Sequence, residues 1–218
     1  MSRNVGVPLH VGIIPDGNRR WARRHNVDLY MAYMRGYSNV KKISKRLYEM
    51  GIKVVTVYGL SMENCLRRPS DEKRIIEKVA IYALQDLRSD EFLRSRRIRL
   101  LILGDPGRFS RSVEAEALET SKALDSGDGG LLVLLICYSG RWEAEEYTSK
   151  GLIPPSLILP PIDLIIRTGG AKRLSGFPPL ASDYAELFFS EKLWPDFTIE
   201  DAMEAVEWYA RQKRNFGR

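Results

Sequence analysis

Histidine and cysteine are scarce in this chain of 218 residues, which has two of each. Zinc sites of ordinary ligand spacing need more such residues, and His10 and His25 lie in no motif of a Ser–His–Asp or Cys–His catalytic site. The cysteines, Cys65 and Cys137, are far apart in sequence. We expect both to be reduced and structural, because free cysteine is among the most often buried residue types. The scarcity argues against zinc enzymes and hydrolases with a histidine base.

Long hydrophobic runs are also missing, and none approaches the roughly 20 residues that span a bilayer. The first residues show no charged, apolar, small-residue succession of a secretory signal. There is no internal repeat and no low-complexity tract. We therefore expect a cytoplasmic protein that forms one domain over residues 1–218.

Positive charge is what the chain has in excess, with a net charge of +6. An anionic small substrate, nucleic acid and an anionic membrane surface would each explain it. The total charge does not separate these alternatives, whereas the placement of the charges does.

Short apolar segments alternate with amphipathic ones along the chain. The expected strands are residues 9–14, 52–58, 98–103, 131–138, 162–166 and 185–189. The expected helices are residues 36–50, 70–87, 111–124 and 198–213, the last with Thr198 as N-cap. This alternation predicts a single-domain α/β fold, with a mainly parallel central sheet of about six strands and helices on both faces.

Ligands of open parallel sheets bind beyond the carboxyl ends of the strands. Three of the expected strands run into polar, glycine-containing segments: PDGNRRW (15–21), SMEN (61–64) and RTGG (167–170). We expect these segments to share one edge of the sheet, where they would form a binding site.

The first of these segments combines a glycine with several cations. Gly17 lets backbone N–H groups approach a ligand, and Arg19, Arg20 and Arg23 supply guanidinium groups that match phosphate oxygens. Asp16 is the one carboxylate among them. It could be a structural salt-bridge or turn residue, or it could hold Mg²⁺, which takes one or two carboxylates plus phosphate oxygens.

The third segment repeats this pattern. Arg167, Arg173 and Ser175 could bind a second anion. A glycine turn with solvated arginines would have the same sequence pattern. Glu186, at the start of the last expected strand, could be a second metal-binding carboxylate or an ordinary surface residue.

Ten segments, in order along nearly the whole chain, resemble those of the cis-prenyltransferase family, the undecaprenyl and dehydrodolichyl diphosphate synthases. They are HVGIIPDGNRRW (10–21), YGLSMEN (58–64), RP (68–69), GD (104–105), YSGRWE (138–143), DLIIRTGG (163–170), RLS (173–175), YAELF (184–188), LWPDF (193–197) and RNFG (214–217). The Asp-Asp-x-x-Asp cluster of trans-type synthases is missing, whereas a single aspartate in a glycine turn is similar to the cis type.

The resemblance implies the cis-prenyltransferase fold and a Mg²⁺-dependent reaction. Isopentenyl diphosphate would be condensed with an allylic diphosphate, farnesyl or geranylgeranyl, to give a cis-polyprenyl diphosphate. It further implies a dimer, as a homodimer or a heterodimer, in which residues 214–217 reach the partner subunit's active site. Membrane contact would be peripheral, through the lipid product.

The resemblance also implies roles for single residues. Asp16 would bind Mg²⁺ with Glu186 and help the allylic diphosphate to leave, and Asn64, with Ser61, would lie where the condensing carbon loses its proton. The remaining substrate-binding residues would be Gly17, Asn18, Arg19, Arg20, Trp21, Met62, Glu63, Arg68, Arg167, Arg173, Leu174 and Ser175. Apolar residues of the helices at 36–50 and 71–87 would border the hydrocarbon or simply form core.

Several positions depart from the family pattern. An arginine is missing near Leu29, the family's Gly-His pair reads Ala32-Tyr33, a customary tryptophan is Cys65 and a customary glutamate is Ala171. The connection between Glu143 and Asp163 is also shorter than in bacterial members.

Two alternatives to an active synthase remain. One is a non-catalytic subunit that supports an active partner, which Leu29 and Ala171 favour and the retained polar residues oppose. The other is a nucleic-acid-binding domain, which is disfavoured because the arginines gather at strand ends rather than along one helix face, and because no binding motif is present.

Overall fold

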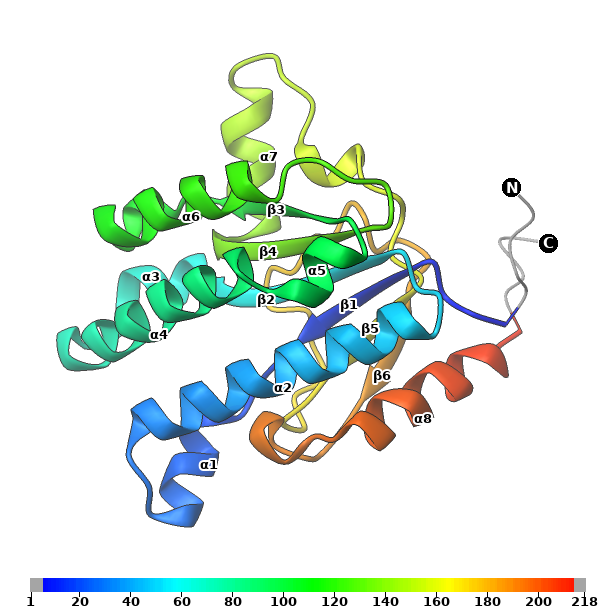
Figure 1. Ribbon diagram of the computed structural model, residues 1–218, viewed down its shortest axis with the longest axis horizontal. Coiled ribbons are helices and arrows are strands. Elements are labelled where there is room, and N and C mark those ends of the chain that lie inside the picture. Colours follow the sequence, from blue (N-terminus) through cyan, green and yellow to red (C-terminus); the bar gives the residue numbers. More distant parts are fainter. Residues whose placement is uncertain (1–5, 214–218) are drawn as a thin grey trace.

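The computed structural model describes residues 6–213, in which six strands form one sheet (Figure 1). All five strand pairs are parallel, in the order β3-β4-β2-β1-β5-β6. The strands are β1 (His10–Ile14), β2 (Val54–Ser61), β3 (Ile98–Gly104), β4 (Gly130–Tyr138), β5 (Leu164–Arg167) and β6 (Glu186–Phe189). The expected six-stranded parallel sheet is confirmed.

Strand β1 lies at the centre of the sheet and is buried along its whole length. Val11 pairs with Val55 of β2 on one side and with Leu164 of β5 on the other. Apolar residues on both faces are what a parallel strand covered on both sides requires.

Helices cover the two faces unequally. The helices are α1 (Asn18–His25), α2 (Leu29–Glu49), α3 (Met62–Arg67), α4 (Ser70–Arg88), α5 (Glu91–Ser95), α6 (Arg111–Ala123), α7 (Gly140–Thr148) and α8 (Ile199–Ala210). Residues of α2, α5 and α8 share the larger core cluster with one face of the sheet. The opposite face packs mostly against irregular segments, through residues such as Phe177 and Ala181, and against Trp142 of α7. The expectation of helices on both faces therefore holds, with α7 on the thinner side.

Three differences from the sequence-based expectation concern helix boundaries. Helix α2 begins at Leu29, seven residues before the expected start, because Asp28 caps it by accepting a hydrogen bond from Met31 N. The short helices α3, α5 and α7 were not expected, and α8 ends at Ala210, three residues before the expected end. The predicted N-cap of the last helix is confirmed, since Thr198 and Asp201 form a capping box.

The three polar strand ends do share one edge, because β2, β1 and β5 are neighbours. After β1, the chain adds β2, β3 and β4 on one side of β1, and then β5 and β6 on the other side. The carboxyl ends of β1 and β5 therefore form the switch point at which ligands bind in such sheets. The first turns of α1 and α4 lie at the same end of the molecule (Figure 1).

The expectation of reduced cysteines is wrong, because Cys65 and Cys137 form a disulfide. They are 72 residues apart in sequence. However, β2 and β4 are adjacent and parallel, so the helix after β2 and the end of β4 meet at the same edge. Within residues 6–213, no helix is both long enough and apolar enough to cross a membrane.

Candidate active site

Asp16 follows β1 directly and is held between two cations. Its Oδ1 lies 3.1 Å from Arg20 Nη2, and its Oδ2 lies 3.1 Å from Arg167 Nη2. Its backbone is fixed by Thr168, whose hydroxyl donates to Asp16 O at 2.8 Å. The Asp16 side chain remains 35% exposed, so a ligand can reach the carboxylate.

Two glycines let the chain pass close to this carboxylate. Gly17 has φ 122°, and a Cβ there would approach the backbone of Leu193 to 3.0 Å. Gly169 has φ 82°, and a Cβ there would lie 2.4 Å from Arg20 Nη2. A side chain at position 17 would therefore push against Leu193, and one at position 169 would push against Arg20 and the backbone of Asp16.

Asn18 begins α1, where backbone N–H groups and the helix dipole favour an anion. Its Oδ1 is buried and has no hydrogen-bond partner among the described residues. A Cβ on Gly36 of α2 would lie 2.5 Å from that oxygen, so only glycine leaves room for it. A buried acceptor without a partner, at the edge of a cavity, is available to a ligand.

The end of β2 leads into α3 and then α4. Ser61 caps α3 by accepting from Asn64 N at 3.2 Å, and Asn64 Oδ1 accepts from Arg68 Nε at 3.2 Å. Arg68 Nη1 in turn lies 2.5 Å from Oε1 of Glu72, which is 8% exposed. Tyr33 of α2 donates to the same oxygen at 2.7 Å. Burial, together with this hydrogen bond, raises the pKa of Tyr33 above its ordinary value, so the hydroxyl stays protonated.

The end of β5 carries Arg167, which is only 4% exposed. Its Nη1 donates to Ser175 Oγ at 2.9 Å and to the carbonyl oxygen of Arg173, whereas its Nε has no partner among residues 6–213. Tyr58 Oη fixes the same loop by donating to Ser175 O at 3.0 Å. A buried guanidinium with an unused N–H is suited to an anion that enters from the cavity.

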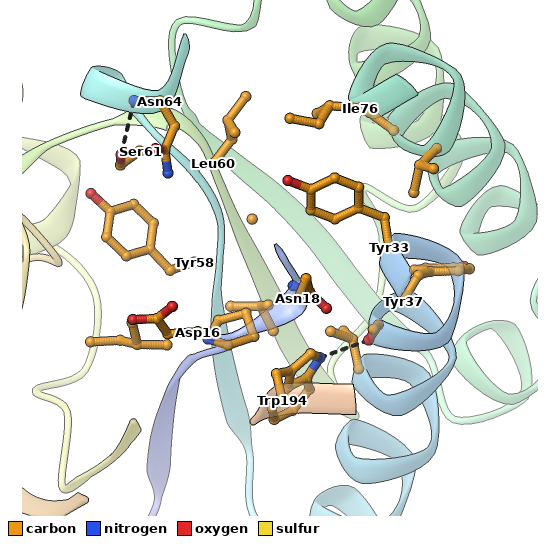
Figure 2. Close-up of a pocket in the computed structure, with 18 of the residues that line it drawn as sticks. Asp16, Asn18, Tyr33, Tyr37, Tyr58, Leu60, Ser61, Asn64, Ile76 and Trp194 are labelled. Carbon is orange, nitrogen blue, oxygen red and sulfur yellow. Dashed lines mark hydrogen bonds between the residues drawn. The ribbon is translucent and has the colours of Figure 1, made fainter. Parts of the chain in front are cut away.

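A cavity of about 890 Å³ connects these groups (Figure 2). Asp16, Tyr58, Ser61 and Asn64 lie on one side of it, and Tyr33 and Tyr37 of α2 lie on the other. Its mouth is polar and cationic. Its depth is lined by apolar residues of α4, α6 and β4, namely Ile76, Val79, Ala80, Ala83, Leu84, Leu87, Val113, Leu134 and Ile136. Asp16 and Arg173 border this one cavity, as two adjacent anion sites require.

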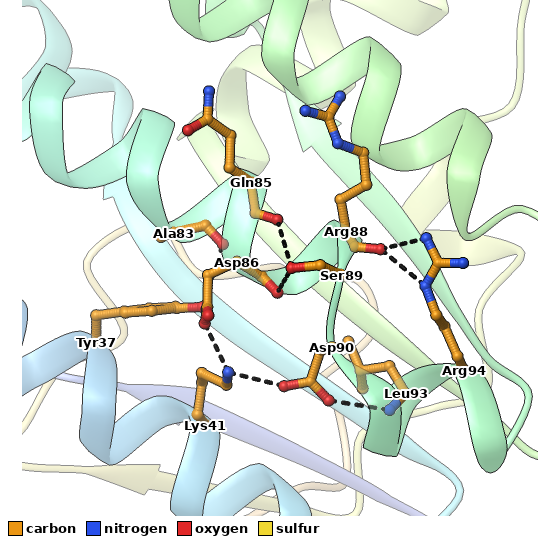
Figure 3. A network of polar contacts seen from close by, with 10 residues as sticks. All are labelled: Tyr37, Lys41, Ala83, Gln85, Asp86, Arg88, Ser89, Asp90, Leu93 and Arg94. Carbon is orange, nitrogen blue, oxygen red and sulfur yellow. Dashed lines mark hydrogen bonds and ion pairs between the residues drawn. The ribbon is translucent and has the colours of Figure 1, made fainter.

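A polar network joins α2 to α4 at the far end of the cavity (Figure 3). Tyr37 Oη donates to Asp86 at 2.6 Å, and Lys41 Nζ lies 2.6 Å from Asp86 and 2.8 Å from Asp90. Burial opposes the charge of Asp86, but the hydrogen bonds from Lys41 and Tyr37 outweigh it and hold the pKa of Asp86 below its usual value. A second cavity of about 500 Å³ is bordered by Lys41, Asp86 and Asp90, and Val40 and Leu87 line both cavities.

Four of the predicted site residues lie elsewhere. Trp21 belongs to the buried face of α1 and packs against Ala32 and Leu193, and its Nε1 donates to Asp196 at 2.7 Å. Met62 and Leu174 pack into the apolar clusters. None of these three lines the cavity. Glu186 pairs with Leu164 at the amino end of β5, about 10 Å along the strands from the level of Arg167.

The other predicted residues line the cavity: Asp16, Gly17, Asn18, Arg19, Arg20, Ser61, Glu63, Asn64, Arg68, Arg167, Arg173 and Ser175. The sequence did not predict site roles for Tyr33, Tyr58 and Glu72, although Tyr33 was noted as a departure from the family pattern and Tyr58 begins a matching segment. Glu72 stands in the first turn of α4, where a glutamate is typical of a helix start. The two tyrosines fit the pattern of core positions.

Asp16 is the residue best placed to hold a metal ion. No group of three or more histidine, cysteine, aspartate or glutamate side chains within residues 6–213 is arranged around a metal position. Mg²⁺ does not require one, because it commonly takes one or two carboxylates and completes its shell with water and substrate phosphates. The partly exposed carboxylate of Asp16 fits such a site.

The cavity opens at the switch point of a parallel sheet, and its opening is cationic whereas its interior is apolar. Such a cavity is typical of an enzyme whose substrates have an anionic head and a hydrocarbon tail. Residues 14–217 match the family model described as putative undecaprenyl diphosphate synthase. The chain belongs to this family, the cis-prenyltransferases.

Relatives and solved structures agree with that assignment. A tritrans,polycis-undecaprenyl-diphosphate synthase (geranylgeranyl-diphosphate specific) of Aeropyrum pernix is 41% identical, over 98% of this chain and all of that protein. An isoprenyl transferase of Neisseria meningitidis is 33% identical, over 99% of this chain and 91% of that protein. The structure of lavandulyl diphosphate synthase from Lavandula x intermedia, in complex with dimethylallyl diphosphate, superimposes with a TM-score of 0.87 at 27% identity, covering 98% and 99% of the two chains.

Proposed function

We propose that this protein condenses isopentenyl diphosphate with an allylic diphosphate and releases a cis-polyprenyl diphosphate. The observation that carries the proposal is the single cavity, in which two groups of arginines flank Asp16 at the mouth and apolar side chains line the depth. Two diphosphates can lie side by side at such a mouth while the growing hydrocarbon extends inward.

The allylic diphosphate is assigned to the first turn of α1. Backbone N–H groups after Gly17 and the guanidinium of Arg20 would bind its phosphate oxygens. A diphosphate carries more charge than Asp16, so it would compete for Arg20 and free carboxylate oxygens of Asp16. Mg²⁺, held by Asp16 and phosphate oxygens, would neutralise the charge that develops on the leaving diphosphate. Cations placed in advance stabilise that charge more in the transition state than in the ground state.

Isopentenyl diphosphate is assigned to the loop that follows β5. Arg167 and Arg173 would bind its phosphates, and Ser175 would donate a further hydrogen bond. Asn64 borders the cavity from α3, where the family resemblance locates proton loss from the condensing carbon. Its Oδ1 is fixed by Arg68, so it is oriented before substrate arrives.

Three finer features belong to the same proposal. The starter is geranylgeranyl diphosphate, since the names of three relatives specify it. The protein contacts the membrane peripherally, through its lipid product. It forms a dimer, and exposed apolar side chains such as Ile153, Ile158 and Tyr184 are candidates for its interface. The expectation for residues 214–217 lies outside the described residues.

The substitution Asp16→Ala tests the proposal. We expect the variant to fold normally and to lose at least about 10²-fold in extension rate, the usual effect of removing one group that stabilises transition-state charge. The assay follows incorporation of labelled isopentenyl diphosphate into geranylgeranyl diphosphate with Mg²⁺. Asp128→Ala is the matched control, because Asp128 pairs with Arg97 on the exposed surface and does not line the cavity.

A variant that retains more than about a tenth of the rate would contradict the role assigned to Asp16. The supporting-subunit alternative predicts a different result, namely no extension by the purified wild-type chain and restoration by a second subunit.

A further inference from the structure

The disulfide Cys65–Cys137 joins the helix that carries Asn64 to the sheet. Cys65 is the next residue after Asn64 in α3, and Cys137 is the penultimate residue of β4. Both cysteines are buried, at 1% and 0% exposure. We propose that this disulfide is a positioning crosslink, which holds α3, and with it Asn64, in place for catalysis. The inference rests on the proposed prenyl transfer and adds two positioning residues to it.

Helix α3 has few other attachments to the sheet. It has six residues, and helices this short are unstable without tertiary support. Its buried residues are Met62 and Cys65, which lie three positions apart and therefore on one face. Glu63, Leu66 and Arg67 are exposed. The face that packs on the molecule thus consists of one apolar side chain and the disulfide.

The backbone of β4 is shaped to present Cys137 to α3. Leu60 pairs with Ile136 and Ser61 pairs with Tyr138, so Cys137 is the extra residue of a β-bulge. Its φ of 49° lies in the left-handed region, which residues other than glycine seldom adopt. Bulges re-aim side chains and are frequent beside active sites. Here the bulge directs the cysteine side chain at the catalytic helix.

The crosslink restrains α3 at a point where the chain does not join it to the sheet. The chain connects α3 to β2 through Ser61 and to α4 through Arg68, so its covalent link to the sheet otherwise lies at its first end alone. The hydrogen bond from Arg68 Nε to Asn64 Oδ1, and the ion pair of Arg68 with Glu72, tie α3 to α4 rather than to the strand that leads to Asp16. The disulfide adds a second attachment to the sheet, so that Asn64 and Asp16 keep a fixed relative position.

Steady-state kinetics of the oxidised and the phosphine-reduced protein test the proposal. We expect reduction to lower kcat by about 10-fold to 100-fold, in line with the cost of small displacements of reacting groups. The KM values for the two diphosphates should change much less, because Arg20, Arg167 and Arg173 lie on other segments. Reoxidation should restore the rate. Mass spectrometry after alkylation would follow the state of the two thiols.

Two variants separate positioning from a general loss of stability. The double variant C65A/C137G removes the crosslink and keeps a residue suited to the left-handed conformation. It should show the reduced enzyme's kcat and no response to reductant. In N64A, reduction should have almost no further effect, because the disulfide acts through the residue already removed. Hydrogen exchange should report faster exchange of the α3 amides on reduction, with α4 unchanged.

The outcomes distinguish this inference from the proposed function. An inactive oxidised wild type would refute the proposed function, and hydrogen exchange would still decide whether the disulfide holds α3. If the wild type is active and reduction changes neither its kcat nor the hydrogen exchange of the α3 amides, the positioning role of the disulfide is wrong and the proposed function stands. Two reactive thiols in the untreated, denatured protein, or a full effect of reduction in N64A, would likewise overturn that role.

Discussion

Arg167 is a nearly buried cation. Among residues 6–213 its one carboxylate partner is Asp16, which also pairs with Arg20. Asp16 offers one oxygen to Arg167 and the other to Arg20, and Arg167 Nε stays without a partner among the described residues. Burying a charge is costly unless hydrogen bonds satisfy it. A diphosphate would satisfy it, so this arrangement favours anion binding over further stabilisation of the fold.

His10 makes the stability of the fold depend on pH. Its ring nitrogens bond Pro160 O and Thr56 Oγ1, both at 2.7 Å, and burial lowers its pKa from 6.5 to about 4. The unfolded chain therefore binds a proton between pH 6.5 and 4 that the folded chain does not. The free energy of unfolding should fall by about 3 kcal/mol as the pH drops through that range.

Urea unfolding at pH 7 and at pH 4.5 measures this dependence. His10→Gln should lose most of it, and His25→Gln is the matched control, because the His25 side chain is 44% exposed. The same pH dependence in wild type and His10→Gln would assign the effect to other groups.

Site residues could be predicted from the sequence where they follow a strand. Asp16, Asn64 and Arg167 each stand just beyond an apolar run, in a segment too polar for the core. Tyr58 and Glu72 lie inside regular elements, where one sequence cannot tell a cavity wall from core packing. Trp21 was wrongly predicted to bind substrate. Its position beside arginines does not reveal that its ring packs into an apolar cluster.

At the scale of elements, α4 forms the wall along which the hydrocarbon would extend. Ala83 lines the cavity there, and its carbonyl accepts a hydrogen bond from Tyr37 at 3.1 Å. The network of Tyr37, Lys41 and Asp86 holds α2 against α4 at this level. The depth available to a product therefore depends on small side chains on the inner face of α4.

The substitution Ala83→Leu should shorten the products without abolishing the first condensations. A larger side chain fills the cavity below the mouth, and the charged groups stay in place. Chromatography of the dephosphorylated products would measure the length distribution. The matched control is Ala210→Leu at the exposed end of α8. An unaltered distribution in Ala83→Leu would place the hydrocarbon elsewhere.

Strands were the elements best predicted from the sequence, because a parallel strand buried on both faces is a distinct apolar run. Their order was not, since the positions of β3 and β4 depend on packing of helices that follow them. Helices α3 and α5 were missed because five or six residues contain too little periodicity. The start of α2 was missed because the residues that follow Asp28 show no clear polar face.

At the scale of the whole molecule, the disulfide closes a long loop of the chain. In the chain-entropy model, a crosslink between residues 72 positions apart stabilises the fold by about 4 kcal/mol. Reduction should therefore lower the midpoint of thermal unfolding by roughly 10 °C for a protein of this size. Calorimetry with and without reductant measures the shift, and C65A/C137G should show none. A wild-type midpoint that is insensitive to reductant would contradict this stabilisation.

The central claim is that two diphosphates lie side by side at the mouth of one cavity. A crystal structure with isopentenyl diphosphate, an unreactive thio analogue of geranylgeranyl diphosphate and Mg²⁺ tests it most directly. We predict one diphosphate at the first turn of α1, joined to Asp16 through the metal ion, a second against Arg167 and Arg173, and the hydrocarbon between α2 and α4. Diphosphates bound away from Asp16, or a hydrocarbon outside this cavity, would contradict the account.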